Sequence, residues 1–250
     1  VGPWAWAEGH APEALERCMS VAVGDRLDHL ACFPWPKAKT LLQETTYSAF
    51  LTGMLDSVSI RGIENPKRDA HIGTGAFNLL RRRSFEQTEG FEWLRLEVAD
   101  DVGVGLLMQR HGMRSRLLIS RRLLELEWYP SLGAAVRGLE KNAFAALGHY
   151  RVWRVLGVFL LWSLFFFGPF VGLLHPSGWV AGISAVALIG FEAAQVAIAR
   201  SLDRPVLSFL LMPLGYWILF YTLVRSAYCC LRRGGIEWRG TTYDLEELRE

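Results

Sequence analysis

"VLGVFLLWSLFFFGPFVGLL", residues 155–174, contains no charged side chain. An α-helix rises about 1.5 Å per residue, so about twenty apolar residues cross a hydrocarbon core of about 30 Å. Two further apolar runs follow, "WVAGISAVALIGFEAAQVAIA" at 179–199 and "PVLSFLLMPLGYWILFYTLV" at 205–224, and the last stays apolar beyond Arg225. The sequence therefore predicts three membrane-spanning helices, at about 155–174, 179–199 and 205–229, within a membrane region at 153–231.

The middle run carries one charge, Glu192. An ionisable group near the bilayer centre costs free energy and normally faces a protein interior or a functional path. Two interpretations stay open. Glu192 is a functional intramembrane acid, or it packs inward and hydrogen-bonds a neighbour such as Gln195 or Tyr221.

Basic residues indicate how the spans are oriented. Arg151 and Arg154 precede the first span, the first loop "HPSG" has no Lys or Arg, and Arg200 and Arg204 flank the second loop. The positive-inside rule therefore places the segment before the spans in the cytoplasm. Three full spans put the polar tail at 232–250 outside, whereas the arginines at its start favour the inside, and we expect a cytoplasmic tail. The protein is therefore predicted to be an integral protein of the bacterial inner membrane, with its soluble domain facing the cytoplasm.

The segment at 131–152, just before the first span, has an amphipathic pattern. Apolar residues recur at steps of three or four, while Arg137, Glu140 and Lys141 lie off that stripe. Such a helix suits the membrane–water interface, although an ordinary helix packed on a core has the same pattern.

The composition limits the class of protein. Hydrophobic residues make up 51% of the 250 residues, and the formal net charge of +2 gives no strong field for nucleic acid. The six histidines are scattered without an HExxH motif, and no GxSxG elbow is present, so zinc and serine-hydrolase chemistry have no support.

The cysteines and the start of the chain carry two further expectations. The four cysteines, Cys18, Cys32, Cys229 and Cys230, have no CxxC spacing. We interpret them as reduced apolar side chains. The sequence begins with Val and shows no signal peptide, so we expect a fragment whose beginning is missing.

The first 130 residues read as an α/β domain. Three stretches predict strands: "RLDHLACFPW" (26–35), the alternating residues 94–99 and "RSRLLIS" (114–120). Two stretches predict helices, at 41–60 and at "VGVGLLMQRHG" (102–112), where Gly112 ends the helix.

Two features of this domain could carry chemistry. Asp100 and Asp101 stand between a predicted strand and a predicted helix, where a carboxylate either caps the helix or faces a cleft and removes a proton from a hydroxyl. "GTGAF" at 73–77 has two glycines that let a ligand approach the backbone, or that form a β-bulge. It lacks a full dinucleotide or phosphate-loop fingerprint.

Taken together, these pieces resemble a known family. "AHIGTGAFNLLRRRSFEQTEGFEWLRLEVADDVGVGLLMQRHG" (70–112) resembles the second half of the catalytic domain of family 2 membrane glycosyltransferases, above all the hopene-associated and ceramide-glucosyltransferase-like branch. There a GxGxFxLxRR stretch leads to an acidic pair, usually Glu-Asp, that opens a helix. "WYPSLGAAVRGLEKNAF" (128–144) and "GGIEWRGTTYDLEELR" (234–249) are also similar to this branch, so the resemblance covers about residues 11–250.

The resemblance implies a fold. Residues 1–130 would form the second half of a GT-A-like domain, with an incomplete Rossmann-like α/β sheet. An interfacial amphipathic helix at 131–152, about three transmembrane α-helices and the polar tail would follow.

It also implies roles for residues of the domain. Asp101 takes the place of the aspartate in the Glu-Asp pair and would deprotonate the acceptor hydroxyl. Asp100 takes the place of the glutamate and would orient or tune it. Gly73, Gly75 and Ala76 would line the wall where the acceptor meets the transferred sugar.

The chain departs from the family at two places. Arg137 stands at the first position of the family's Q/R-x-x-R-W motif, which contacts the donor diphosphate, but Glu140 and Lys141 replace Arg and Trp. Arg137 and Lys141 still offer positive charge for that contact. The family's DxD motif, which holds Mg²⁺ or Mn²⁺ on the sugar diphosphate, belongs before residue 11, where this sequence reads "VGPWAWAEGH".

The resemblance therefore implies the acceptor side of an inverting glycosyltransferase, which moves a sugar from a nucleotide sugar such as a UDP-sugar to a lipid hydroxyl. We expect this chain alone to be inactive and to hold no metal, because the donor site is missing. The alternative is a membrane-anchored binding or scaffold protein that keeps the fold without catalysis.

Overall fold

The computed structural model describes residues 11–57, 60–65, 70–94, 100–120, 124–148, 150–238 and 241–244. The chain divides into two compact units. The first contains residues 1–37 and 52–128, and the second contains residues 38–51 and 129–250. Helix α2, Leu41–Ser57, contributes to both units because the division falls within it.

The first unit is a small mixed α/β structure. Its helices are α1 (Ala11–Gly24), α3 (Ile60–Ile63), α4 (Arg82–Phe85), α5 (Gly90–Trp93) and α6 (Asp100–Arg110). Its strands are β1 (His29–Phe33), β2 (Trp35–Pro36), β3 (Asn78–Leu80), β4 (Ser115–Ile119) and β5 (Glu125–Leu126).

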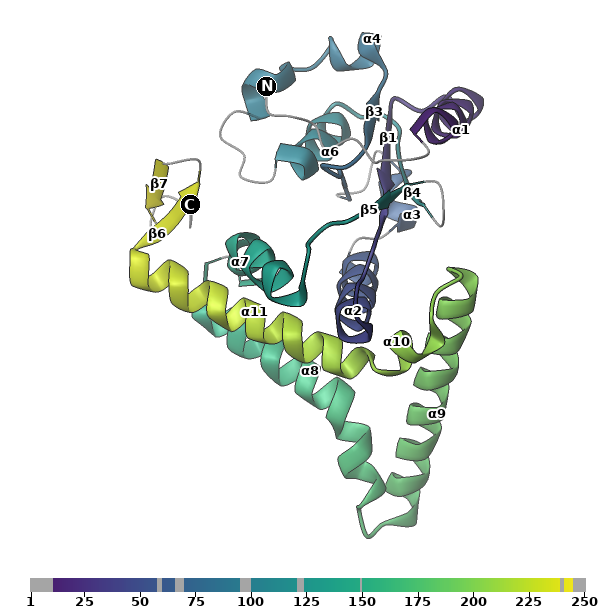
Figure 1. Ribbon diagram of the computed structural model, residues 1–250, viewed down its shortest axis with the longest axis vertical. Coiled ribbons are helices and arrows are strands. Elements are labelled where there is room, and N and C mark those ends of the chain that lie inside the picture. Colours follow the sequence, from purple (N-terminus) through teal and green to yellow (C-terminus); the bar gives the residue numbers. More distant parts are fainter. Residues whose placement is uncertain are drawn as a thin grey trace. The chain divides into compact units, whose positions relative to one another are not determined.

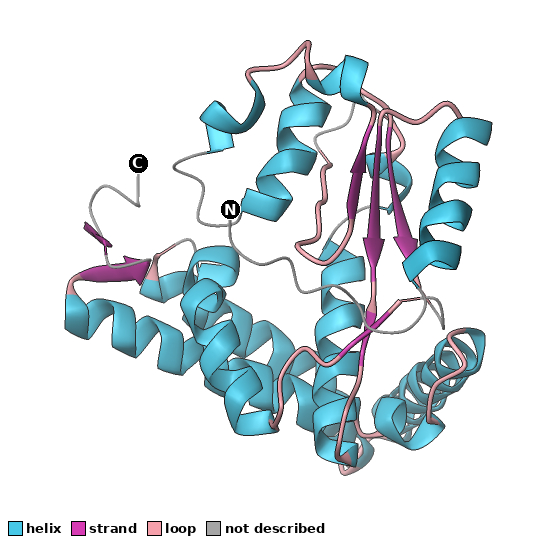
Figure 2. Ribbon diagram, turned by 45° about the horizontal axis from the view of Figure 1, so that its top comes forward, coloured by secondary structure: helices cyan, strands magenta, loops and turns pink. Residues whose placement is uncertain are grey.

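Strand β1 is the centre of a three-stranded sheet of order β3-β1-β4. It pairs antiparallel with β3, where His29 lies opposite Leu80, and parallel with β4, where His29 lies opposite Ser115. Both faces of β1 are covered, because Leu30 and Cys32 pack in a cluster with α1, whereas Ala31 packs in a cluster with α3. Figure 2 shows α1 on one side of the three strands and α6 on the other. Short parallel strands β2 and β5 continue from this sheet.

The second unit is mainly helical. It contains most of α2, then α7 (Leu132–Gly148), α8 (Val152–Leu173), α9 (Gly178–Ser201), α10 (Val206–Leu210) and α11 (Met212–Arg233), and a hairpin of β6 (Gly235–Trp238) and β7 (Thr241–Asp244). Figure 1 shows α8 and α11 running side by side, with α9 joined to α8 through a tight loop. Phe144 of α7, Val155 of α8 and Leu223 of α11 share one buried cluster.

Among the described residues, three helices are long and apolar enough to cross a membrane: Val152–Leu173, Gly178–Ser201 and Met212–Arg233. This result supports association with a membrane. The third run differs from the single helix expected over 205–229. It breaks at Leu211 into α10 and α11, because Pro213 lacks a backbone N–H and is accommodated in the first turn of a new helix.

Several local predictions for the first 130 residues are confirmed. The strand in 26–35, the helix beginning at 41, the helix ending before Gly112 and the strand in 114–120 all form. Gly112 has a φ of 67°, the left-handed conformation that ends helices. The strand predicted from Leu94 is wrong at its first residue, because Leu94 has helical dihedrals as the C-cap of α5. Residues 95–99 of that prediction lie outside the described residues.

Candidate functional site

The carboxylate of Asp101 contacts the glycine-rich loop that precedes β3. The backbone N–H of Gly75 donates a hydrogen bond of 2.7 Å to Oδ2 of Asp101. Among the described residues, no donor reaches the other oxygen, Oδ1. Gly75 and Ala76 are exposed, and Asp101 is half-buried at the start of α6, so this carboxylate borders solvent. The fold thus brings together four of the predicted site residues, Gly73, Gly75, Ala76 and Asp101.

Asp100 has a different environment, although it is the next residue. It is the first residue of α6, and its Oδ1 accepts the backbone N–H of Asp101 at 3.0 Å. This contact occupies one of the free N–H groups that every helix start presents. The two aspartates thus make different contacts. Asp100 satisfies the helix end, and Asp101 extends to the loop.

The loop lies against α6 because glycines allow two backbones to meet. A Cβ on Gly73 would lie 1.7 Å from the carbonyl oxygen of Asp101, and a Cβ on Gly105 of α6 would lie 2.1 Å from the carbonyl oxygen of Ile72. Real Cβ atoms do not approach so closely. A Cβ on Gly75 would instead meet Oδ2 of Asp101 at 3.3 Å, a tight contact with a side chain that can move. Gly73 and Gly105 therefore fix the loop on the helix.

A buried hydrogen-bond network holds the other side of the loop. Oδ1 of Asn78 accepts the backbone N–H of Thr74 at 3.3 Å and lies 3.2 Å from Nε2 of His29. Because a carboxamide oxygen only accepts, Nε2 of His29 carries the proton. Nδ1 then accepts from the hydroxyl of Ser115, which lies at 3.2 Å. The network connects the buried sheet to the segment that carries Gly75.

The environment of His29 favours its neutral form. The side chain is buried at the centre of the sheet. This burial lowers the pKa of His29, and the hydrogen bond to Asn78 opposes the shift only in part. A neutral His29 fits the donor and acceptor roles that its two neighbours require.

The remaining predicted residues lie in the second unit. Arg137 and Lys141 both belong to α7, and the Arg137 side chain is exposed. Nε of Arg225 in α11 donates a hydrogen bond of 2.5 Å to Oε2 of Glu140. Glu140 therefore neutralises a cation of the neighbouring helix. In α9, Oε2 of Glu192 and Oε1 of Gln195 are buried without a hydrogen-bond partner among the described residues. The hydrogen bond that the sequence suggested for Glu192 therefore does not form through Oε2.

Among the described residues, no group of side chains forms a cage for Mg²⁺ or Mn²⁺. Within the described part of the chain, no three His, Cys, Asp or Glu side chains gather in a way that could hold an ion. In the Asp100–Asp101 pair, one oxygen of each carboxylate already accepts a backbone N–H.

A buried polar stretch of α2, which forms an ion pair with Arg204, was not predicted from the sequence. Residues Gln43 to Ala49 of this helix are all buried. Oε1 of Glu44 accepts hydrogen bonds from Arg204 at 2.6 and 2.9 Å. The α11 backbone also approaches this stretch closely, because a Cβ on Gly215 would lie 2.5 Å from the carbonyl oxygen of Thr45. The signal available in the sequence was the run "QETTYS" (43–48). It is polar but contains no turn residue, which is consistent with a helix whose polar side chains have partners.

Comparison of the chain with models of protein families, with curated proteins and with solved structures finds no match.

Proposed function

We propose that this chain is the acceptor side of an inverting membrane glycosyltransferase of family 2. The Gly75–Asp101 contact carries the proposal. In this contact one oxygen of a half-buried carboxylate accepts a backbone N–H, next to the exposed residues Gly75 and Ala76. In this proposal the mixed sheet and α6 are the second half of a GT-A-like domain.

Asp101 acts as the general base. A lipid hydroxyl lies beside Gly75 and Ala76, and Oδ1 of Asp101 takes its proton as the hydroxyl oxygen attacks the anomeric carbon of the sugar. The bond between that carbon and the nucleoside diphosphate breaks, and the diphosphate leaves with the electron pair. The N–H of Gly75 keeps the carboxylate oriented, so little reorganisation is needed during the transfer.

The donor side requires groups that these 250 residues do not supply. The sequence contains no Asp-x-Asp pair, and Arg137 and Lys141 are the proposed contacts to the diphosphate. We therefore expect transfer from a UDP-sugar only when a donor-binding half is present. We also expect the domain that carries Asp101 to face the bacterial cytoplasm. Protease protection of the domain in sealed inverted vesicles of the inner membrane would contradict that orientation.

The decisive experiment compares two matched variants in the protein that carries the donor-binding half. Asp101→Asn keeps an oxygen that can accept the Gly75 N–H, but it removes the base. It should lower the formation of radiolabelled glycolipid by about 10²-fold or more, the usual contribution of a general base. Asp100→Asn keeps the helix cap and should lose far less. Undiminished transfer by Asp101→Asn rules out this role.

A non-catalytic scaffold is the second candidate, and the lack of an Asp-x-Asp pair favours it. The two candidates differ in one measurement. If the protein with its donor-binding half forms no glycolipid from any nucleotide sugar, yet remains folded and inserted, the scaffold stands and the transferase is excluded.

A further inference from the structure

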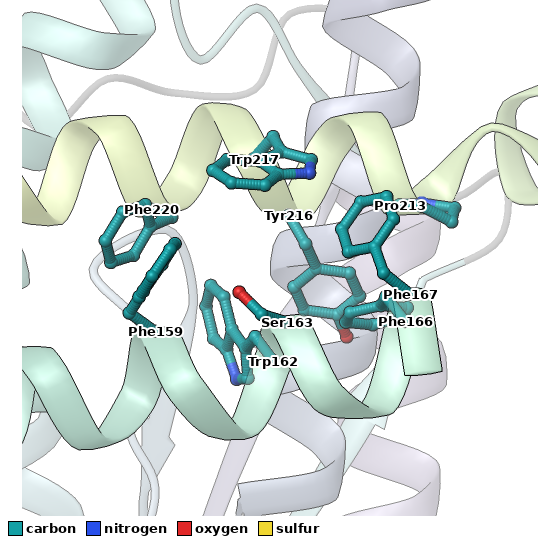
Figure 3. A pocket seen from close by; sticks show the side chains of 9 residues that line it. All are labelled: Phe159, Trp162, Ser163, Phe166, Phe167, Pro213, Tyr216, Trp217 and Phe220. Carbon is teal, nitrogen blue, oxygen red and sulfur yellow. The ribbon is translucent and has the colours of Figure 1, made fainter. Parts of the chain in front are cut away.

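Helix α11 runs in the opposite direction to α8, its neighbour in the second unit. Phe166 of α8 contacts Tyr216 of α11 at a centroid distance of 4.5 Å. Phe159, closer to the start of α8, contacts Phe220, closer to the end of α11, at 4.7 Å. Figure 3 shows both ring pairs between the two helices. The end of α11 therefore lies beside the start of α8.

Helix α9 also runs opposite to α8. A Cβ on Gly172, near the end of α8, would lie 2.1 Å from Oγ of Ser184 in α9. Phe166, six residues earlier on α8, contacts Phe191, seven residues later on α9, at 5.8 Å. Helices α9 and α11 therefore run in the same direction, although one follows the other in the chain. Helices that cross a membrane one after another alternate in direction, so this arrangement does not fit three crossings.

Phe166 marks one level in all three helices, because it contacts both Phe191 and Tyr216. At 1.5 Å per residue, α9 begins about 20 Å from this level, towards the turn that joins α8 to α9. Helix α11 begins only about 6 Å from it in that direction. The last residues of α9 and α11 both lie on the other side of this level, where α8 starts. Helix α11 thus begins within the thickness that α9 crosses.

The segment between α9 and α11 is too short to lead the chain back to the far side. It covers residues 202–211, and five of them form α10. Five helical residues rise about 7.5 Å, and about six extended steps add about 20 Å, so the segment reaches about 27 Å at most. Helix α9, whose length it would have to retrace, has 24 residues and is about 36 Å long.

Helix α2 covers this short segment. Ser208 and Phe209 of α10 are fully buried, and the hydroxyl oxygens of Ser48 and Ser208 lie 3.5 Å apart. At the start of α11, Gly215 allows the carbonyl of Thr45 to approach closely. A helix break inside a bilayer needs protein around it, because the freed backbone groups find no water there. The buried polar stretch of α2 supplies those surroundings.

We propose that α10 and α11 form a re-entrant element, which enters the membrane from the side where α8 starts and leaves it on that same side. Helices α8 and α9 then make the two complete crossings. The polar tail from residue 234 lies on the same side as the segment that precedes α8. This inference does not depend on sugar transfer, since it concerns only the path of the chain through the lipid.

The distribution of arginines agrees with this path. Arginines occur at the start of α8 and towards the ends of α9 and α11, whereas the turn at 174–177 has no Lys or Arg. They are Arg151, Arg154, Arg200, Arg204, Arg225, Arg232 and Arg233. With three crossings, the last three would lie opposite the first four, against the positive-inside rule. A re-entrant element places all seven on one side.

Reaction of single cysteines with a membrane-impermeant maleimide tests the path in bacterial membranes. The whole 250-residue chain carries alanine at its four natural cysteines and one new cysteine. Ser201→Cys, at the end of α9, and Arg233→Cys, at the end of α11, should both react in inverted vesicles. His175→Cys, in the turn between α8 and α9, should react in intact spheroplasts. If Arg233→Cys reacts together with His175→Cys rather than with Ser201→Cys, the proposal is overturned.

A matched pair of cysteines tests the depth at which α11 begins. Leu214 is 50% and Leu231 is 43% exposed on the protein surface, so only lipid can shield a cysteine at either position. Leu214→Cys should stay unmodified in both membrane preparations and react after denaturation in dodecyl sulfate, whereas Leu231→Cys should react in inverted vesicles. Reaction of Leu214→Cys alongside Ser201→Cys would place the start of α11 at the membrane surface and overturn the proposal.

A reporter fused after Glu250 of the unaltered chain gives an answer if the cysteine-free chain does not insert. The positive-inside rule places the start of α8 in the cytoplasm. Green fluorescent protein, which becomes fluorescent on that side, should be bright, and alkaline phosphatase, which is active only outside, should be inactive. The reverse result overturns the proposal, since the tail then lies opposite the start of α8.

Discussion

The backbone N–H of Gly75 donates a 2.7 Å hydrogen bond to Oδ2 of Asp101, joining a loop before β3 to the first turn of α6 across 26 positions of the sequence. The contact is possible because Gly73, two residues earlier, lets the loop backbone rest on the carbonyl of Asp101. The position of the proposed base is therefore set by a neighbouring glycine that does not contact its carboxylate.

Substitution of Gly73 should be costly. Gly73→Ala places a Cβ 1.7 Å from the carbonyl oxygen of Asp101, so one of the two backbones must move. Overpacking of this kind costs about 1–3 kcal/mol of unfolding free energy or more. Thermal unfolding in detergent measures the loss. Gly24→Ala is the control, because no atom lies within 4 Å of its new Cβ. Equal melting temperatures for the two variants would show that the loop does not rest on α6.

The buried ion pair of the second unit should show strong coupling. Glu44 is 6% exposed, and Arg204→Met leaves its carboxylate buried without this cation, a change that costs about 3–5 kcal/mol in buried pairs. Glu44→Gln combined with Arg204→Met should cost clearly less than Arg204→Met alone, because no buried charge remains. The unfolding free energies of a double-mutant cycle test this. Additive losses would contradict the pairing.

The exposed pair Glu13–Arg17 of α1 is the control for that cycle. Both side chains are more than half exposed, so solvent screens their attraction. Arg17→Met should change stability by well under about 1 kcal/mol.

His29 should make the first unit less stable in acid. Its pKa is lowered in the folded protein, mainly by burial, so the unfolded chain binds the proton more tightly. Stability from this group is complete above the unfolded pKa of about 6.5 and is lost as the pH falls below it, by at most about 1.4 kcal/mol per pH unit. His29→Gln should flatten the dependence of unfolding free energy on pH between 6.5 and 5. An identical slope in both proteins would assign the acid sensitivity elsewhere.

Cys32 should resist alkylation while the protein is folded. Burial raises its pKa to about 12, with Cys18 adding to the shift, so the reactive thiolate is scarce at neutral pH. Mass spectrometry after brief treatment with iodoacetamide at pH 8 should find Cys32 unmodified, and denaturant should make it react. Rapid modification of Cys32 in the folded protein would show that α1 does not cover β1 as described.

Much of the local structure could be predicted from sequence patterns. Twenty uncharged residues from 155 predict a helix in lipid because every backbone polar group there must be satisfied internally, and α8 follows that expectation. Gly112 predicted the end of α6 for an equally local reason, its freedom to adopt a positive φ. The break between α10 and α11 was missed because the apolar pattern continues through Pro213, and hydrophobicity alone does not distinguish one helix from two.

The pairing of distant residues lay beyond the sequence. Nothing in "QETTYS" identifies Arg204 as the partner of Glu44, and nothing in the positions of His29, Asn78 and Ser115 shows that they share one network. Such contacts depend on how elements pack, and that packing is a sum of many weak interactions rather than a local preference.

The sequence by itself determined the apolar spans, the position of the helix that Asp100 and Asp101 begin, and the glycines before β3, because each follows from chain geometry or from the need to satisfy the backbone. Only the tertiary structure decided that Asp101, rather than Asp100, contacts those glycines, and that Glu44 of α2 pairs with Arg204. Both outcomes depend on which side chain meets which neighbour once the helices and the sheet are packed.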